Sequence, residues 1–109
     1  MEIRETEKFC IITPLSPKLN ERESLKLENE ILNSEKKRIG IDLSFVNDCT
    51  IDFISQLLNF KNISLFNIPS DIFAILISMN LDKSIPLYVS ELDFTEDKHQ
   101  LLNRKFSLV

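Results

Sequence analysis

The sequence predicts an α/β fold in which amphipathic helices pack against a sheet of about four strands, largely parallel or mixed. Short apolar segments rich in Ile, Leu and Phe alternate along the chain with segments of helical periodicity. A length of 109 residues allows one core, and 43% hydrophobic residues is typical of a folded chain. We therefore expect a single domain over 1–109, with its core at about 8–95 and a C-terminal helix or tail at 95–109.

The first predicted elements are a strand and an amphipathic helix. The apolar run "KFCIITPL" (8–15) is rich in β-forming residues and ends near Pro14, which predicts a strand that stops or lies at an edge. Asn20 can cap the following helix, because its side-chain oxygen accepts hydrogen bonds from the first helical amides. The apolar face of this helix is predicted from residues at roughly helical spacing: Leu25, Ile31 and Leu32, with Leu27 beside them.

The central segment predicts a buried strand followed by a buried helix. "RIGIDLSFV" (38–46) alternates in part, which favours a central strand. One face would carry Ile39, Ile41, Leu43 and Phe45, and the other Gly40, Asp42, Ser44 and Val46. Gly40 is the only glycine, and a glycine inside a strand indicates close approach by a neighbouring group. "TIDFISQLLNF" (50–60) has apolar residues three to four positions apart, which predicts the helix.

A third strand and a third helix follow. "ISLFNI" (63–68) predicts a strand that Pro69 ends. Ser70 or Asp71 is the predicted cap of the helix "DIFAILISMN" (71–80). The inner face of this helix is predicted from its apolar periodicity: Ile72, Ile75, Leu76 and Met79.

The last predicted elements are a fourth strand, "IPLYVSEL" (85–92), and a helix that starts at Thr95 and runs through Leu102. The segment "RKFSLV" (104–109) would form a tail or add to a sheet edge. The alternation of strands and helices is the pattern of a layered fold with a largely parallel sheet.

Composition narrows the classes of partner. Seventeen acidic and thirteen basic residues give a net charge of -4, which repels nucleic acid and anionic lipid. The basic run 36–38 is interpreted as a solvated turn. No apolar stretch reaches the roughly 18 residues of a membrane span, and "MEIRETEK" lacks the apolar centre of a signal peptide. We expect a cytoplasmic protein without direct membrane insertion, and its two cysteines, Cys10 and Cys49, do not form a disulfide framework.

The residue types needed for common chemistry are missing. His99 has no second His or Cys at metal-ligand spacing, so neither a metal site nor a Cys-His nucleophile is predicted. One glycine is too few for a glycine-rich phosphate loop. Asp42 and Asp48 could in principle act as acid and base, but surface and cap roles are commoner for such residues. We expect no catalytic residue and no cofactor, and a binding function rather than an enzyme.

The polar junction at 47–50 is the candidate site. Asp48 follows the central strand and precedes an apolar helix, so its carboxylate could accept hydrogen bonds from the amides of Thr50 or Ile51. Free amides at a helix start also form an anion site, so an added phosphate would fit there. Capping and modification are both compatible with this sequence.

The junction resembles the STAS domain family, named for sulfate transporters and anti-sigma factor antagonists. "IGIDLSFVNDCTIDFISQLL" is similar to the family's strand, Asp-Ser-Ser or Asp-Ser-Thr motif and apolar helix. "ISLFNIPSDIFAILISMNLDKSIPLYVS" is similar to its next strand, Ser/Pro turn, helix and final strand, and "FCIITPLSPKLN" to its earlier strand and turn. The resemblance covers roughly residues 8–95 and implies a stand-alone, divergent STAS fold.

The sequence departs from the family pattern at the junction itself. Cys49 stands where anti-sigma factor antagonists carry the phosphorylated serine, and Ile51 replaces a glycine. Thr50 keeps a hydroxyl one position later. Pro17 and Asn20 occupy the places of the family's Gly and Asp in the first turn.

The resemblance implies partner switching. An unmodified domain binds an anti-sigma factor with serine-kinase-like activity, and a phosphate at the helix start ends that binding by charge repulsion and desolvation. The residues implied for partner binding are Asn20, Asp48, Cys49, Thr50 and Ser70, with Thr50 as the candidate phosphorylation site. Cys49 leaves three states open: a permanently binding-competent form, a switch at Thr50, or a site that no longer switches.

Other interpretations of the same residues remain open. The chain could be the small STAS accessory subunit of an ABC-type lipid transporter, docked on its ATPase subunit and not phosphorylated. An unrelated small α/β enzyme would need a catalytic constellation that the sequence lacks. Cys49 could be a redox thiol with a pKa lowered by the helix start, which Asp48 would oppose, or a partly buried packing thiol.

Overall fold

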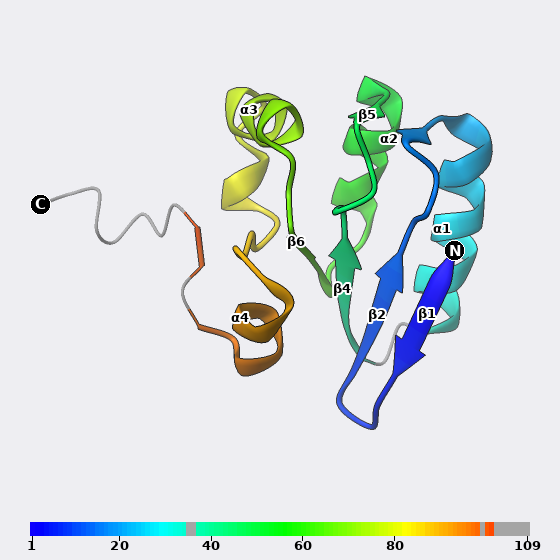
Figure 1. Cartoon of the computed structure of the whole chain (residues 1–109), viewed down its shortest axis with the longest axis vertical. Coiled ribbons are helices and arrows are strands. Elements are labelled where there is room, and N and C mark those ends of the chain that lie inside the picture. The colour runs from blue at the N-terminus through cyan, green and yellow to red at the C-terminus, as the bar shows by residue number, and fades with distance from the viewer. Residues whose placement is uncertain (35–36, 99, 102–109) are drawn as a thin grey trace, which may run out of the picture.

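The computed structural model describes residues 1–34, 37–98 and 100–101, and its centre is a four-stranded mixed sheet (Figure 1). The strand order is β1-β2-β4-β6. β1 runs antiparallel to β2, whereas β2, β4 and β6 are parallel neighbours. The bounds of these strands are Glu2–Glu5 (β1), Phe9–Thr13 (β2), Arg38–Asp42 (β4) and Ile63–Phe66 (β6).

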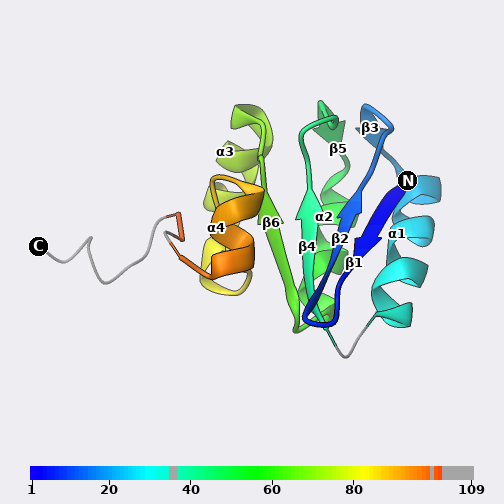
Figure 2. The ribbon, with the colours of Figure 1, turned by 60° about the horizontal axis from the view of Figure 1, so that its bottom comes forward.

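Helices cover both faces of this sheet. α1, α2 and α3 lie on one face and α4 on the other, as Figure 2 shows. The helices span Glu21–Asn33 (α1), Ile51–Gln56 (α2), Ser70–Ser78 (α3) and Glu91–Glu96 (α4), and two 3-10 turns span Leu57–Asn59 (η1) and Leu81–Lys83 (η2). A second, two-stranded sheet joins Lys18–Leu19 (β3) and Asp48–Cys49 (β5). The predicted mixed α/β fold is confirmed.

The main core lies between the sheet and α1, α2 and α3. Ile12, Ile41 and Leu65 are register partners across β2, β4 and β6, so their side chains form one row on this face. The three helices pack against this row with side chains that are at most 4% exposed: Leu27 and Ile31 of α1, Phe53 and Ile54 of α2, and Ile72 and Leu76 of α3. Burial of these rows is the main force that holds the layers together.

The opposite face of the sheet holds a smaller aromatic core around α4. Phe94 is fully buried, and its ring stacks on Phe66 at 5.6 Å and meets Phe9 and Tyr88 edge-on. Gly40 lies directly beneath it, where an added Cβ atom would be 2.7 Å from the ring. The sequence-based interpretation of Gly40 as a point of close approach is therefore confirmed.

Two arginines tie α4 to the sheet. Arg4 of β1 forms a bidentate ion pair with Glu91 at the start of α4. Arg38 of β4 donates a hydrogen bond to the backbone oxygen of Phe94 at 2.9 Å, and its guanidinium lies 4.6 Å from the centre of that ring. The charged groups at the edge of the aromatic core thus fix the position of the helix.

The N-terminal strand β1 was not predicted. All four of its residues are exposed, and its sequence, Glu-Ile-Arg-Glu, lacks the apolar alternation of a half-buried strand. It forms because the turn at 6–8 lets it pair antiparallel with β2, with Glu2 opposite Thr13 and Glu5 opposite Cys10. Charged side chains on such an edge strand discourage pairing with other chains.

The predicted apolar face of α1 is partly wrong. Leu27 and Ile31 are buried, as expected, but Leu25 and Leu32 are 58% and 51% exposed, and Ser24 is buried instead. Residues four positions apart share a helix face, so Leu27 and Ile31 define the inner face. Leu25 and Leu32 lie seven positions apart on another side of the same helix.

The central strand ends earlier than predicted. β4 stops at Asp42, whose side-chain oxygen accepts the backbone amide of Ser44 at 3.0 Å, so the chain turns there. Leu43 and Val46 remain buried, but Phe45 is 57% exposed. The prediction that Phe45 continues the inward face of the strand is therefore wrong.

The region after η2 also differs from the prediction. The segment 85–89 contributes an isolated parallel bridge, Leu65 with Leu87, rather than a full strand. Ser90 caps α4 by accepting a hydrogen bond from the amide of Asp93, so the helix starts at Glu91 and not at Thr95. It ends at Glu96, and His99 and Leu102, to which the predicted helix extended, lie outside the described residues.

Candidate functional site

The two-stranded sheet brings the starts of α1 and α2 together. Lys18 pairs with Asp48 and Leu19 with Cys49 in parallel register. The amide of Thr50 donates to the backbone oxygen of Leu19 at 3.2 Å. β3 and β5 lie side by side at one end of the molecule (Figure 2), and each leads directly into a helix. Asn20 and Thr50 follow the paired residues Leu19 and Cys49, so they are neighbours although they are far apart in sequence.

Asn20 is the N-cap of α1, as the sequence predicts. Its side-chain oxygen accepts the backbone amide of Glu23 at 3.2 Å. Its backbone oxygen accepts a hydrogen bond from the hydroxyl of Ser24 at 2.9 Å. The side chain of Asn20 is exposed, so it holds the helix start and remains accessible from outside.

The N-cap of α2 is Thr50, not Asp48. The Thr50 hydroxyl oxygen accepts the backbone amide of Phe53 at 3.1 Å. Asp48 lies two residues before the helix, in β5, and its side chain is exposed. Because the residue immediately before the first helical position makes the cap, the predicted capping role of Asp48 is wrong.

Cys49 lies between these two residues and points partly inward. The side chain is half-buried and packs against the main core. Burial, and then the neighbouring carboxylate of Asp48, raises the pKa of the Cys49 thiol from 9.0 to about 11. A thiol in this state is protonated near neutral pH, which favours the packing interpretation over the redox one.

Ser70 lies at the start of a neighbouring helix. It is the first residue of α3 and is exposed, and α3 contacts β5. The N-cap position is Pro69, which makes no side-chain cap hydrogen bond, so the prediction that Ser70 or Asp71 caps this helix is wrong. The structure therefore holds Asp48 and Cys49 in the β3–β5 ladder, with the caps Asn20 and Thr50 directly after its two strands, and α3, which begins with Ser70, contacts β5.

Exposed apolar side chains occur in the same set of connections. Ile51, the first residue of α2, is 65% exposed. Phe45 in the β4–β5 connection and Leu15 in the β2–β3 connection are 57% and 52% exposed. We call the surface formed by Asn20, 48–51 and Ser70 the helix-start face. Sequence reasoning did not assign Ile51 to a binding surface, because its helical periodicity suggested burial.

A groove of about 500 Å³ lies between the first turns of α1 and α2, beside Thr50. Its lining is mostly polar and carries carboxylates but no basic side chain: Glu21, Ser24, Thr50, Asp52, Phe53, Ser55, Gln56 and Asn59. A negative group added at the Thr50 hydroxyl would therefore lie near the carboxylates of Glu21 and Asp52.

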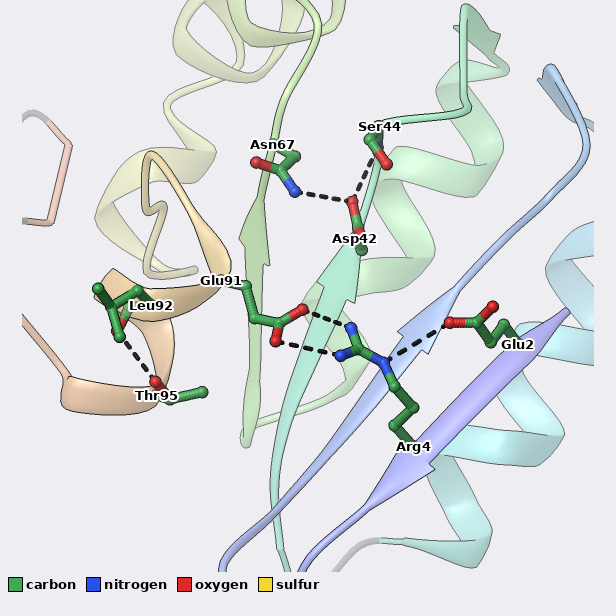
Figure 3. Close-up of polar contacts among 8 residues, drawn as sticks. All are labelled: Glu2, Arg4, Asp42, Ser44, Asn67, Glu91, Leu92 and Thr95. Atoms are coloured by element: carbon green, nitrogen blue, oxygen red, sulfur yellow. Dashed lines mark hydrogen bonds and ion pairs between the residues drawn. The ribbon is translucent and has the colours of Figure 1, made fainter.

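A second polar group lies at the end of β4 and β6, on the face that carries α4 (Figure 3). The carboxylate of Asp42 is buried and accepts hydrogen bonds from the Ser44 amide and, at 3.1 Å, from the side chain of Asn67. Asn67 adopts a left-handed backbone conformation, with φ of 53°. Asp42 thus joins two strand ends, which is a structural role and not the acid–base role considered for it with Asp48.

Two kinds of feature, metal-ligand groups and membrane-spanning helices, were sought in residues 1–34, 37–98 and 100–101. Within these ranges, no group of three or more His, Cys, Asp or Glu side chains is placed to hold a metal ion. None of the helices in this part of the chain is both long and apolar enough to cross a bilayer.

Comparisons with known proteins support the fold. No family model and no curated protein matches the sequence. Among solved structures, the fold is similar to the crystal structure of "a putative anti-sigma factor antagonist" from Thermotoga maritima, with a TM-score of 0.75. The match covers 88% of this chain and 92% of that one at 16% identity. The chain therefore shares the fold of that protein, which agrees with the fold expected from the STAS resemblance.

Proposed function

We propose that this chain is a non-catalytic regulatory module that binds a protein partner through the helix-start face, as an anti-sigma factor antagonist does. The observation that carries the proposal is the β3–β5 ladder, which places the exposed Asn20 beside Thr50 and Ile51. An exposed apolar side chain beside exposed polar groups supports contact with another protein, because protein interfaces bury apolar anchors inside a polar rim.

The proposed partner is an anti-sigma factor with serine-kinase-like activity, encountered in the cytoplasm. Ile51 is the expected anchor, because it is apolar, 65% exposed and surrounded by polar residues of the same face. Buried apolar anchors of this kind carry much of the free energy of an interface. Asn20 and Asp48 would supply polar contacts at the rim.

A phosphate on Thr50 would act against this interface. The hydroxyl belongs to an exposed residue and borders the groove that contains Glu21 and Asp52. Phosphorylation adds about -1.5 to -2 charges. Repulsion from Asp48, Asp52 and Glu21, together with the desolvation of the phosphate at a contact surface, would weaken partner binding. Cys49 cannot accept a phosphate from a serine kinase, so Thr50 is the residue of the junction that could serve.

The experiment is affinity capture of the tagged full chain from the lysate of its native host. Wild type is compared with Ile51→Asp and with Leu32→Asp, a control that places the same charge on an exposed leucine of α1 away from the helix-start face. We expect a kinase-like anti-sigma factor in the wild-type and Leu32→Asp captures and at least a roughly tenfold loss with Ile51→Asp, the effect of removing a hot-spot contact.

Two other results would change the proposal. Equal capture by Ile51→Asp would place the binding surface elsewhere. A transporter ATPase in place of the anti-sigma factor would make the chain an accessory subunit of a transporter. Mass measurement of the peptide that contains 48–50 tests the switch separately, since a phosphate on Thr50 is expected only for a switching module.

A further inference from the structure

A polar pocket of about 260 Å³ lies where β4 and β6 begin, beside the end of α4. Its lining includes Arg38, Lys61, Ser64, Tyr88 and Asp97. The helix-start face follows the opposite ends of these two parallel strands, because α2 comes after β4 and α3 comes after β6. The pocket is therefore separate from the surface proposed for the protein partner.

Ser64 brings a buried hydroxyl to this pocket. It is the register partner of Gly40, so its side chain lies on the face of the sheet that carries Phe94. Only 6% of Ser64 is exposed, yet its hydroxyl makes no hydrogen bond to any residue in the ranges 1–34, 37–98 and 100–101. Buried hydroxyls are normally paired, because an unpaired one lowers the stability of the fold. The Ser64 hydroxyl can therefore pair with a molecule in the pocket.

Two cationic side chains line the same pocket. The guanidinium of Arg38 is fixed, because its Nη2 donates to the backbone oxygen of Phe94 at 2.9 Å and its carbon lies 4.6 Å from the centre of that ring. Its Nη1 and Nε make no hydrogen bond within the described part of the chain. Lys61 is exposed, and no carboxylate of the described residues forms an ion pair with it. Both cations thus have N–H groups left to donate.

The one carboxylate of the pocket lining, Asp97, is already engaged. Its Oδ1 accepts a hydrogen bond from the hydroxyl of Tyr88 and lies 3.9 Å from Nη2 of Arg38. Burial, and then the bond to Asp97, raises the pKa of Tyr88, so the phenol stays protonated and remains the donor of this pair. Two cations and one carboxylate leave the pocket lining positive, although the chain as a whole has a net charge of -4. An anion is therefore the ligand that the pocket favours.

We propose that this pocket binds a phosphate group, either as the free ion or as part of a small molecule. A phosphate monoester has three terminal oxygens that accept hydrogen bonds strongly. Three side chains of the pocket have donors to spare, Arg38, Lys61 and Ser64, which matches one to each oxygen. Arginine and lysine are the usual cationic ligands of phosphate. The pocket is smaller than the roughly 300–1,000 Å³ of sites for drug-sized ligands, so the molecule is small.

Titration of the ¹⁵N-labelled full chain with inorganic phosphate tests the site by NMR. At constant pH and ionic strength, the amide resonances of Lys61 and Ser64 should shift and reach saturation. Lys61→Gln and Ser64→Ala should each weaken binding, the former by at least roughly tenfold, because each removes a hydrogen bond to a charged group. Lys26→Gln removes the same charge from α1, on the other face of the sheet, and should leave the affinity unchanged.

Two further titrants identify the ligand. Acetate has two oxygens instead of three and should bind at least roughly tenfold more weakly than phosphate. Glycerol 3-phosphate separates the two sources: tighter binding than inorganic phosphate identifies an ester as the ligand, and equal or weaker binding identifies the free ion. Acetate binding as tightly as phosphate would overturn the proposal. So would the absence of a saturable shift at Lys61 and Ser64, or an equal loss of affinity in Lys26→Gln, in variants that far-UV circular dichroism shows to be folded.

Discussion

Replacement of Gly40 by alanine should destabilise the protein through α4. The new methyl group would lie 2.7 Å from Cε2 and 2.8 Å from Cζ of Phe94, and 2.9 Å from Cε1 of Phe66, all closer than a Cβ atom tolerates. The Phe94 ring cannot turn away freely, because it is fully buried between aromatic neighbours and lies under the guanidinium of Arg38. The substitution therefore has to move α4 or distort the sheet.

The magnitude follows from two opposing effects. Overpacking a well-filled core costs about 1–3 kcal/mol. Alanine also restricts the unfolded chain more than glycine does, which stabilises the folded protein by about 0.4–1 kcal/mol where alanine can adopt the native backbone conformation. Gly40 has no positive φ, so alanine can adopt its backbone conformation. The free energy of unfolding should therefore fall by about 1–2 kcal/mol. For a chain of this size, the melting temperature should fall by about 4–8 °C for each kcal/mol.

Urea unfolding followed by far-UV circular dichroism measures this change as a lower midpoint at an unchanged slope. Phe94→Leu provides the matched test, because it removes the ring atoms that clash. The Gly40→Ala loss should be much smaller in the Phe94→Leu background than in the wild type. A midpoint that does not fall, or losses that add fully in the double variant, would refute the steric argument.

Three further perturbations test the site and the α4 contacts. Thr50→Ala should lower the free energy of unfolding by about 1 kcal/mol in the same urea assay, because the α2 cap is lost, whereas Thr50→Ser should retain most of it. At pH 8, Cys49 should react with iodoacetamide roughly a hundredfold more slowly than a thiol of pKa 9.0, because its own pKa is about 11. Asp48→Asn should speed the reaction, and a rate equal to that of a free cysteine would contradict the burial argument. Arg4→Ala should cost about 1 kcal/mol or less, an effect that 1 M salt reduces, since its ion pair with Glu91 is largely exposed.

Features that depend on local side-chain chemistry or regular periodicity were predictable from the sequence. Asn20 was identified as a cap because a short amide side chain before a charged first helical turn has one common role. The parallel sheet and its alternation with helices followed from apolar runs of the right length. Gly40 was identified as a contact point from its position within such a run.

Features that depend on distant pairing were not predictable. β3 and β5 have two residues each, which is too few to show any periodicity. They form because Leu19 and Cys49, which are distant in sequence, pair in parallel register. The cap of α2 was assigned to Asp48 because Asp and Thr are both good caps, and only the exact start of the helix separates them. Phe45 continues the alternation of its strand in sequence, but the Asp42 hydrogen bond turns the chain before it.

The β3–β5 ladder also determines what kind of molecule can be recognised. Neighbouring strands stand about 4.8 Å apart, so Asn20 and Thr50 follow positions separated by one strand spacing although they come from different parts of the sequence. An unfolded or cleaved chain does not hold these two groups at that fixed spacing. A partner that contacts the two helix starts together would therefore bind the folded protein and not its unfolded or degraded forms.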